Sequence, residues 1–263
     1  IKTSAGNADQ NLTAAFLGVV DMPVITTPRL KSYSYRTPEL TSIAAPYDYV
    51  RKMRASYYVL GPLLARAGKV ELSLPGGCAI GTRPMDIHLA AMEEMGAKID
   101  IRNGYVYGEV DGRLKGAHIV FRTVSVGATC NVLMAATLAE GITVLENAAK
   151  EPEIGDLINL LNDMGAKISG IGTSILTIEG VKKLHGARHK VIPDRIEAGS
   201  YAVAAAITGG KIELINAQTY TLKTPMKILQ KMGVEVMPTE RGILVDATGK
   251  KLIGEDIITE PFP

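Results

Sequence analysis

Three copies of one short sequence constrain this chain more than any other feature. A four-residue motif of methionine, glycine, a small residue and a charged residue begins at Met95, Met164 and Met232, at offsets of 69 and 68 positions. Two further markers keep the same register: a Leu-x-Gly triplet at residues 114, 184 and 252, and a strand-like stretch at 69–72, 142–145 and 211–214. Three markers in one register predict a repeated structural unit.

Each repeat has the pattern of strand, loop, helix, strand, short strand and connecting helix. Ile158, Leu161 and Met164 lie at helical spacing, and the next glycine is a helix stop. Ile168 and the alternating run 174–178 predict strands. Connecting helices are predicted over 131–140 and 198–208, each closed by glycine. A period near 69 residues is too long for common solenoids and predicts an α/β fold of compact βαβαββ units.

A further repeat, which precedes the three marked copies, is shorter than the others. Val144 and Ile212 are separated by 68 positions, whereas the matching Val24 and Val70 are separated by only 46, so about 22 residues are missing. Either this copy has eroded, or a stretch of the natural chain is absent from the sequence. We favour the second explanation, because a unit without its helix leaves one sheet face uncovered.

Composition excludes several classes of protein. Hydrophobic residues make up 46% and charged residues 21%, the balance of a soluble globular α/β protein, and the net charge is +2. Neither a nucleic-acid-binding surface nor a charged tail is expected. The apolar runs are too short for a bilayer, and no secretory leader is recognisable. Two cysteines give no disulfide framework, which predicts a reducing, cytoplasmic environment.

A glycine-rich insertion marks the point where the repeat departs from itself. From the glycine before each strand to the methionine marker, the units measure 27, 23 and 22 residues, and the extra residues fall within 74–84. Glycines let the backbone approach a ligand, and Arg83 would lower the thiol pKa of Cys78 or bind an anion. Cys78 is therefore a candidate acid or nucleophile. The alternative is a mobile surface loop with an incidental cysteine. Cys130, in an apolar helix, is predicted to be a buried core thiol.

The starts of the connecting helices form a second candidate site. They lie at residues 53–56, 124–129 and 194–197, at equivalent places in the repeat. Helix N-termini favour phosphate, so pseudo-symmetric units could direct them at one point. Ser125 and Gly127 suit a backbone anion site, and Arg54 suits a phosphate or carboxylate. The alternatives are ordinary N-capping by Ser125 and Asp194 and a plain surface role for Arg54.

We expect neither a metal nor an organic cofactor. His185 and His189 have helical spacing but lie in a polar segment without a matching acid. No GxGxxG follows a strand and no GxxxxGK[ST] occurs, so dinucleotide and P-loop sites are not predicted.

Six segments together resemble the enolpyruvyl transferase family, from Ala45 to the C-terminus. They are MRAS (53–56), LPGGCAIGTRPMDIHL (74–89), DGRLKGAHIV (111–120), VSVGAT (124–129), ENAAKEPEI (146–154) and PDRIEAG (193–199). The cysteine loop is typical of the members that act on UDP-N-acetylglucosamine, and members that act on shikimate phosphate share the fold without it.

The resemblance implies two domains, each an inverse α/β barrel of three βαβαββ units. Residues 1–192 would form the first domain, and 193–263 one unit of an incomplete second domain. The implied reaction transfers the enolpyruvyl group of phosphoenolpyruvate to the 3′-hydroxyl of UDP-N-acetylglucosamine with release of phosphate, the first committed step of peptidoglycan synthesis. It passes through a tetrahedral intermediate and uses no cofactor. The implied partners are these two substrates, without nucleic acid or membrane; the oligomeric state stays open.

The resemblance also implies roles for individual residues. Cys78 would donate a proton to the phosphoenolpyruvate methylene and would be the target of fosfomycin, and Arg83 would contact phosphoenolpyruvate. Residues 83–87 would hold the uridine end and residues 123–126 the diphosphate. The implied substrate-binding residues are Asn7, Arg54, Arg83, Pro84, Met85, Asp86, Ile87, Thr123, Val124, Ser125 and Val126.

Three departures from the family pattern bear on activity. Gly6 stands where the family has a lysine before Asn7, and Thr123 stands where a lysine usually touches phosphate. The family's catalytic aspartate follows residues 260–263 almost at once, so we expect this 263-residue stretch to be inactive by itself. The alternatives are a shikimate-type transferase, a catalytically dead sugar-nucleotide-binding homologue and an interaction module without a small ligand.

Overall fold

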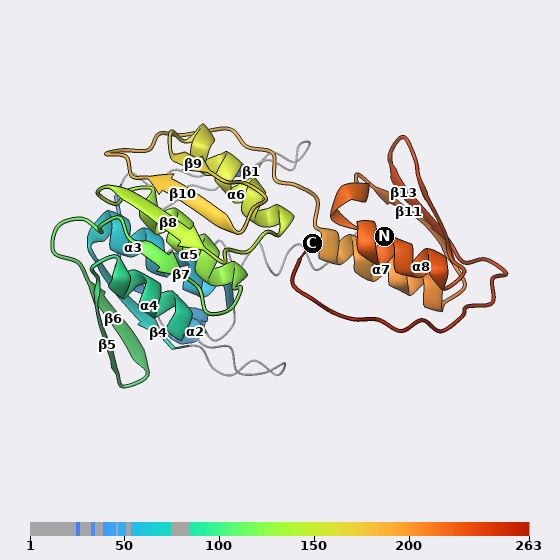
Figure 1. Cartoon of the computed structure of the whole chain (residues 1–263), viewed down its shortest axis with the longest axis horizontal. Coiled ribbons are helices and arrows are strands. Elements are labelled where there is room, and N and C mark those ends of the chain that lie inside the picture. Colours follow the sequence, from blue (N-terminus) through green and yellow to red (C-terminus); the bar gives the residue numbers. More distant parts are fainter. Residues whose placement is uncertain are drawn as a thin grey trace. The chain divides into compact units, whose positions relative to one another are not determined.

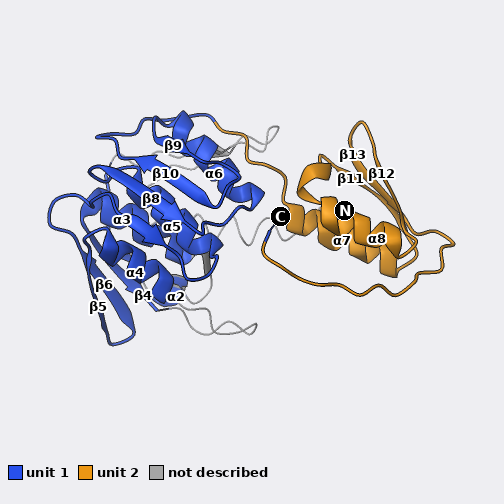
Figure 2. Cartoon of the chain, viewed as in Figure 1, with its two compact units in different colours: residues 1–188, 262–263 blue, residues 189–261 orange. Residues whose placement is uncertain are grey.

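The sequence repeats fold into repeated structure. The computed structural model describes residues 25–26, 33–34, 39–45, 47–50, 54–74 and 85–262. The chain divides into two compact units, one of Ile1–Arg188 with Phe262–Pro263 and one of His189–Pro261 (Figure 2). Each unit is described by itself.

Most strands of the larger unit belong to two four-stranded sheets of the same topology. The first has the order β3 (Ala44–Ala45), β4 (Lys69–Ser73), β6 (Tyr105–Glu109), β5 (Lys98–Arg102). The second has the order β7 (His118–Val120), β8 (Ile142–Glu146), β10 (Ile175–Glu179), β9 (Lys167–Ser169). In each sheet the short first strand pairs parallel to its neighbour and the other pairs are antiparallel. A separate pair joins β1 (Ile25–Thr26) to β2 (Tyr33–Ser34).

Helix α5 (Val126–Ala136) lies at the centre of the larger unit (Figure 1). The other helical segments are α2 (Tyr47–Val50), η1 (Arg54–Val59), α3 (Leu60–Ala67), α4 (Asp86–Glu94) and α6 (Pro152–Asp163). Helix α5 contacts α3, α4, α6, η1 and the second sheet, and its Val132 and Leu133 are completely buried. The aliphatic core of this unit therefore surrounds one helix.

The smaller unit contains the third repeat. Its elements are α7 (Arg195–Ile207), β11 (Lys211–Ile215), η2 (Thr219–Thr221), α8 (Lys223–Lys231), β12 (Glu235–Pro238) and β13 (Gly242–Asp246). The sheet order is β11, β13, β12, all antiparallel, around a core of its own. Residues 188–192 are in no strand, so among the described residues β11 has no parallel neighbour like β3 or β7.

The glycine of the methionine marker has a conformational role. Gly96, Gly165 and Gly233 follow the last residues of helices α4, α6 and α8 and have φ of 90°, 95° and 96°. A side chain disfavours this left-handed backbone, and glycine there lets the chain leave the helix and enter the next strand. The sequence marker is thus the helix stop of each unit.

The structure confirms the predicted strands and corrects the predicted helices. Strands β9 and β10 lie where Ile168 and the run 174–178 predicted them. The helix predicted over 131–140 begins and ends earlier, and the helix predicted over 198–208 begins three residues earlier. Both begin within the helix starts predicted at 124–129 and 194–197. Both start where a side chain caps the first turn, a signal that outweighs the apolar periodicity. In the short repeat that precedes the three copies, the polar stretch 29–42 is described only at residues 33–34 and 39–42.

The chain passes from the larger unit to the smaller one between residues 188 and 189, whereas the sequence placed the domain boundary between 192 and 193. Assignment of these units to two enolpyruvyl transferase domains stays a prediction. In the described part of the chain, no helix is both long and apolar enough to cross a membrane.

Arg113 joins the two repeats of the larger unit. Its Nε and Nη2 donate to Leu138 O at 3.0 and 2.8 Å, and Nη2 also donates to Ala139 O at 3.1 Å and Val181 O at 2.7 Å. Leu138 and Ala139 follow the end of α5 and Val181 follows β10, so the guanidinium connects the segment after the helix to the segment after the second sheet's strand β10.

Replacement of Arg113 by methionine should destabilise the larger unit by about 2 kcal/mol, because hydrogen bonds from a charged donor are lost to partly buried carbonyls. Arg113→Lys should recover less than half, since an ammonium cannot reproduce the fork. Urea unfolding measures both, with the exposed Arg188→Met as a control that changes stability by less than about 0.5 kcal/mol. Equal effects of Arg113→Met and the control would contradict this role.

Asp246 should make the smaller unit acid-sensitive. Hydrogen bonds from Lys211 Nζ at 2.7 Å and from the Thr248 backbone N–H at 2.9 Å lower the pKa of Asp246 from 3.8 to about 2. Its contribution to stability is therefore complete above pH 3.8 and is lost as the pH falls through about 2. Asp246→Asn should remove that part of the pH dependence. Urea midpoints of both proteins between pH 2 and 5 give the difference, and parallel curves would refute the assignment.

Candidate functional site

Two of the predicted substrate-binding segments lie at the starts of neighbouring helices. Residues 85–87 open α4, residues 123–126 lead into α5, and the two helices contact each other. Arg54 opens η1, which also contacts α5. Asn7, Cys78, Arg83 and Pro84 lie outside the described residues. The tertiary structure thus brings together segments that are almost forty positions apart in the sequence.

The start of α5 is capped in the way its sequence predicts. Ser125 has extended backbone angles, and its hydroxyl accepts a hydrogen bond from Ala128 N at 3.3 Å. The buried Thr129 hydroxyl donates to Ser125 O at 2.8 Å and accepts from Ala149 N at 3.1 Å. This first turn is therefore fixed both within α5 and to the loop after β8.

The start of α4 offers its main-chain groups and one carboxylate, that of Asp86, to a ligand. Met85 and Ile87 are each 8% exposed and belong to the core, so their side chains are committed to packing. Asp86, the first residue of α4, forms an ion pair with Arg122 next to α5. The sequence placed Arg122 beside Thr123 but did not reveal this pair, which links the predicted uridine segment to the predicted diphosphate segment.

A buried polar network lies directly beneath these helix starts. Asn131 is completely buried, and its Oδ1 accepts from Gly61 N at 2.9 Å. Its Nδ2 lies 3.0 Å from Tyr57 O and 2.9 Å from His88 Nδ1. Sequence reasoning missed this network. A polar asparagine inside the apolar run of α5 was the available signal, because a buried amide requires partners.

Two close approaches allow the network to form. A Cβ on Gly61 would lie 2.4 Å from Asn131 O, and a Cβ on Gly127 would lie 3.0 Å from His88 Cε1. Glycine therefore lets α3 reach α5 and lets the His88 ring lie against the first turn of α5.

Cys130 was predicted to be a buried core thiol, and the structure shows it in the core but not completely covered. It is partly buried and packs against the core. Burial, reinforced by the nearby carboxylates Glu151 and Glu153, raises the pKa of Cys130 to about 12. The thiolate, which is the reactive form, is scarce near neutral pH.

The starts of the connecting helices are now defined one by one. The predicted start at 53–56 is a 3-10 helix rather than an α-helix, and it continues into α3. Asp194 caps α7 by accepting from Ile196 N and Glu197 N at 2.8 and 3.0 Å. Capping by Ser125 and Asp194 is confirmed, while convergence of all three starts stays a prediction.

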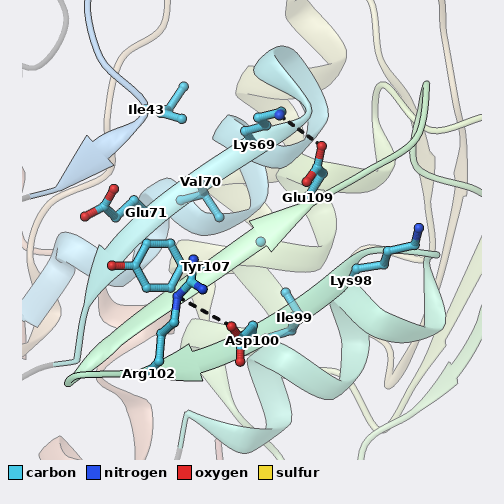
Figure 3. A pocket seen from close by; sticks show the side chains of 11 residues that line it. Ile43, Lys69, Val70, Glu71, Lys98, Ile99, Asp100, Arg102, Tyr107 and Glu109 are labelled. Carbon is cyan, nitrogen blue, oxygen red and sulfur yellow. Dashed lines mark ion pairs between the residues drawn. The ribbon is translucent and has the colours of Figure 1, made fainter.

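A shallow hollow of about 350 Å³ lies elsewhere, on the solvent face of the first sheet (Figure 3). Its charges largely pair with one another: Lys69 with Glu109 at 2.9 Å and Arg102 with Asp100 at 3.5 Å. The Arg102 guanidinium lies 4.4 Å from the centre of the Tyr107 ring. No predicted site residue lines the hollow. Within the described ranges, no three His, Cys, Asp or Glu side chains are grouped as metal ligands.

Comparison with known proteins assigns the chain to a family. The family model EPSP synthase (3-phosphoshikimate 1-carboxyvinyltransferase) matches residues 12–263. The chain is 60% identical over 219 residues to UDP-N-acetylglucosamine 1-carboxyvinyltransferase of Paramagnetospirillum magneticum, covering 83% of this chain and 51% of that protein. It is 59% identical over 225 residues to the enzyme of the same name from Granulibacter bethesdensis, covering 86% and 53%. The chain thus spans about half the length of these relatives.

The fold has a solved counterpart at low identity. The enolpyruvyl transferase NikO from Streptomyces tendae superposes with a TM-score of 0.76 at 20% identity, covering 90% of this chain and 57% of that one. The mixed α/β architecture of repeated β-α-β units is therefore shared with an enolpyruvyl transferase.

Gly61→Ala should destabilise the larger unit by about 2 kcal/mol or more, because the added methyl meets the backbone of α5 and overpacking exceeds the gain in helix propensity. Gly155→Ala in α6 is the matched control, since its Cβ would meet only the Ile171 side chain at 3.4 Å. We expect the control to be neutral or stabilised by up to about 1 kcal/mol. Thermal and urea unfolding compare the two, and equal stability would contradict the close contact.

Proposed function

The chain belongs to the EPSP synthase family, and from this membership we propose that it serves the transfer of an enolpyruvyl group from phosphoenolpyruvate to UDP-N-acetylglucosamine. The single observation that carries the proposal is the identity of 60% and 59% to two UDP-N-acetylglucosamine 1-carboxyvinyltransferases. The complete reaction is proposed for a polypeptide that joins this chain to the part corresponding to the other half of these relatives. It would supply the first committed step of peptidoglycan synthesis.

The proposed chemistry is an addition followed by an elimination. The 3′-hydroxyl of the sugar nucleotide gives up its proton to a general base as its oxygen bonds to C2 of phosphoenolpyruvate, and C3 takes a proton, which yields a tetrahedral intermediate. Loss of a proton from C3 then expels phosphate and restores the double bond in the product. We assign the proton donated to C3 to Cys78 and contact with phosphoenolpyruvate to Arg83, by their matched positions in the family pattern. A loop closing over the substrates would exclude water.

The described part of the proposed site would hold the nucleotide. The first turn of α5 suits a diphosphate, because backbone N–H groups and the helix dipole favour an anion at that end. Arg122, beside Thr123, brings a cation to the same segment, where the family usually has a lysine. The start of α4 would contact the uridine through main-chain groups, since Met85 and Ile87 are buried.

We also propose that the units are parts of two inverse α/β barrels, with residues 1–192 in the first and 193–263 in an incomplete second. Burial of α5 within the larger unit supports this arrangement. The equivalent helix α7 exposes Ile196 by 61%, Val203 by 47% and Ile207 by 74%, as expected of a barrel helix without its remaining neighbours. A cytoplasmic location is proposed from the cysteine usage.

A second candidate is a sugar-nucleotide-binding homologue without turnover. Thr123, where the family usually has a lysine, is the observation that favours it. This candidate predicts binding of UDP-N-acetylglucosamine without release of phosphate from phosphoenolpyruvate, even when the second half is joined to the chain.

Fosfomycin labelling followed by mass spectrometry tests the proposed site. We expect one adduct, on Cys78, formed faster in the presence of UDP-N-acetylglucosamine. Cys130 should stay unlabelled at pH 7–8, because its pKa of about 12 leaves almost no thiolate. Cys130→Ser is the control and should label like the unchanged chain. Adducts on Cys130, or no adduct and no nucleotide binding, would count against the proposal.

A further inference from the structure

Asn131 occupies an unusual place for an amide. It lies in the middle of the central helix α5, is completely buried, and connects three segments: α3 through Gly61, η1 through Tyr57 and α4 through His88. The sequence separations of these contacts are 70, 74 and 43 residues. A buried amide with this many partners is held in one orientation.

The hydrogen bonds define which amide atom is which. The Gly61 backbone N–H can only donate, so the Asn131 atom 2.9 Å away is the carbonyl oxygen Oδ1. The Tyr57 carbonyl can only accept, so the atom 3.0 Å from it is the NH₂ nitrogen Nδ2. Two backbone groups of opposite polarity thus remove the usual ambiguity of an asparagine flip.

The same assignment fixes the proton on His88. Nδ2 has two protons, one for Tyr57 O and one for His88 Nδ1 at 2.9 Å, so Nδ1 accepts. A neutral imidazole that accepts at Nδ1 carries its proton at Nε2. The ring edge with Cε1 and Nε2 faces Gly127, at 3.0 and 3.2 Å from where a Cβ would lie.

His88 therefore links the two helix starts of the candidate site. It follows Ile87 directly in α4, and its ring lies against the first turn of α5, one residue beyond the 123–126 segment. The Arg122–Asp86 ion pair joins the same two segments, but it is exposed, whereas the Asn131–His88 bond is buried. The buried bond is the more rigid of the two links, because solvent does not compete for it.

We propose that Asn131 is a positioning residue for the sugar nucleotide: it holds His88 as the Nε2–H tautomer and thereby sets the start of α4 against the first turn of α5. This inference rests on the proposed function, because it assigns a purpose to the geometry of the nucleotide segments. Asn131 is too deep to touch a ligand and acts only through His88 and Gly127.

Asn131→Asp is the sharpest perturbation, because it keeps the shape and inverts the hydrogen bond. The carboxylate can still accept from Gly61 N, but it has no proton for Tyr57 O or for His88 Nδ1. The bond to Tyr57 O is therefore lost, and His88 must donate from Nδ1. The proton on His88 then moves from Nε2 to Nδ1, or the ring takes up a second proton.

The tautomer is measured first, and on the unmutated network. Replacement of His118, His185 and His189 by glutamine leaves His88 as the sole histidine of the four in the chain. Long-range ¹H–¹⁵N spectra of this ¹⁵N-labelled protein should show a neutral ring protonated at Nε2 near pH 7. Addition of Asn131→Asp should place a proton on Nδ1. A ring protonated at Nδ1 in the protein with Asn131 intact would overturn the inference. This measurement does not depend on whether an Asn131 variant folds.

Nucleotide affinity is measured second, by calorimetric titration of the chain with UDP-N-acetylglucosamine. Asn131→Asp should weaken binding about tenfold, as expected for loss of one well-placed hydrogen bond to an ionic group. The control is Asn162→Asp in α6. There the amide also accepts from a backbone N–H and donates to a backbone carbonyl, at 2.9 and 3.0 Å, both of Ile168. The control should lose stability but keep its affinity for the nucleotide within about twofold, a smaller change than the loss of one hydrogen bond would cause.

The outcomes separate this inference from the proposed function. If the unchanged chain binds the nucleotide and Asn131→Asp binds it equally well, the positioning role is wrong and the proposed function stands. A parallel loss of affinity in the Asn162 control would also overturn it, because general destabilisation would then explain both. Failure of the unchanged chain to bind the nucleotide would refute the nucleotide site and the positioning role together.

Discussion

Burial of helix α5 is the constraint on which the larger unit depends. A helix with no exposed residue must satisfy the polar groups it carries and must fit its neighbours closely. The chain meets the first requirement with the partners of Asn131 and Thr129, and the second with Gly61 and Gly127. Arg113 completes the arrangement by binding the carbonyls that follow the end of the helix. The predicted ligand-binding segment lies at the start of this helix, so the helix that contacts α3, α4, α6 and η1 also supports the candidate site.

Repetition explains how the site can be assembled from simple parts. The same order of strand, helix and two further strands occurs three times, with a glycine of left-handed conformation at the same point of each. Differences between copies then mark special roles. After the first strand, the second and third copies turn through Asn147 and Asn216 at positive φ, whereas the first copy continues into the cysteine loop. A repeated scaffold can keep its fold while one copy gains an insertion, because the insertion falls between elements and not within them.

Prediction from the sequence was strongest where structure depends on neighbours in the chain. The strands around Ile168 and Ile178 follow from alternation, and the caps at Ser125 and Asp194 from side-chain type. The end of the connecting helix predicted over 131–140 was wrong, because it depends on distant contacts. Residues after Ala136 leave the helix to meet the first repeat, where Glu140 N donates to Leu114 O at 2.7 Å. Apolar periodicity alone could not reveal that change.

The sequence by itself determined the repeat, the helix stops, the caps and membership of the family. The first three depend on short local motifs, and the fourth depends on similarity to the family along most of the chain. Only the tertiary structure decided which helix starts become neighbours and which polar groups become partners. Gly61, His88 and Asn131 are separated by 43 to 74 positions from the groups they bind, and nothing near them in the chain specifies those partners. Their pairing follows from close packing around α5, since a buried hydrogen-bonding group must find its partner among whatever the fold brings within about 3 Å.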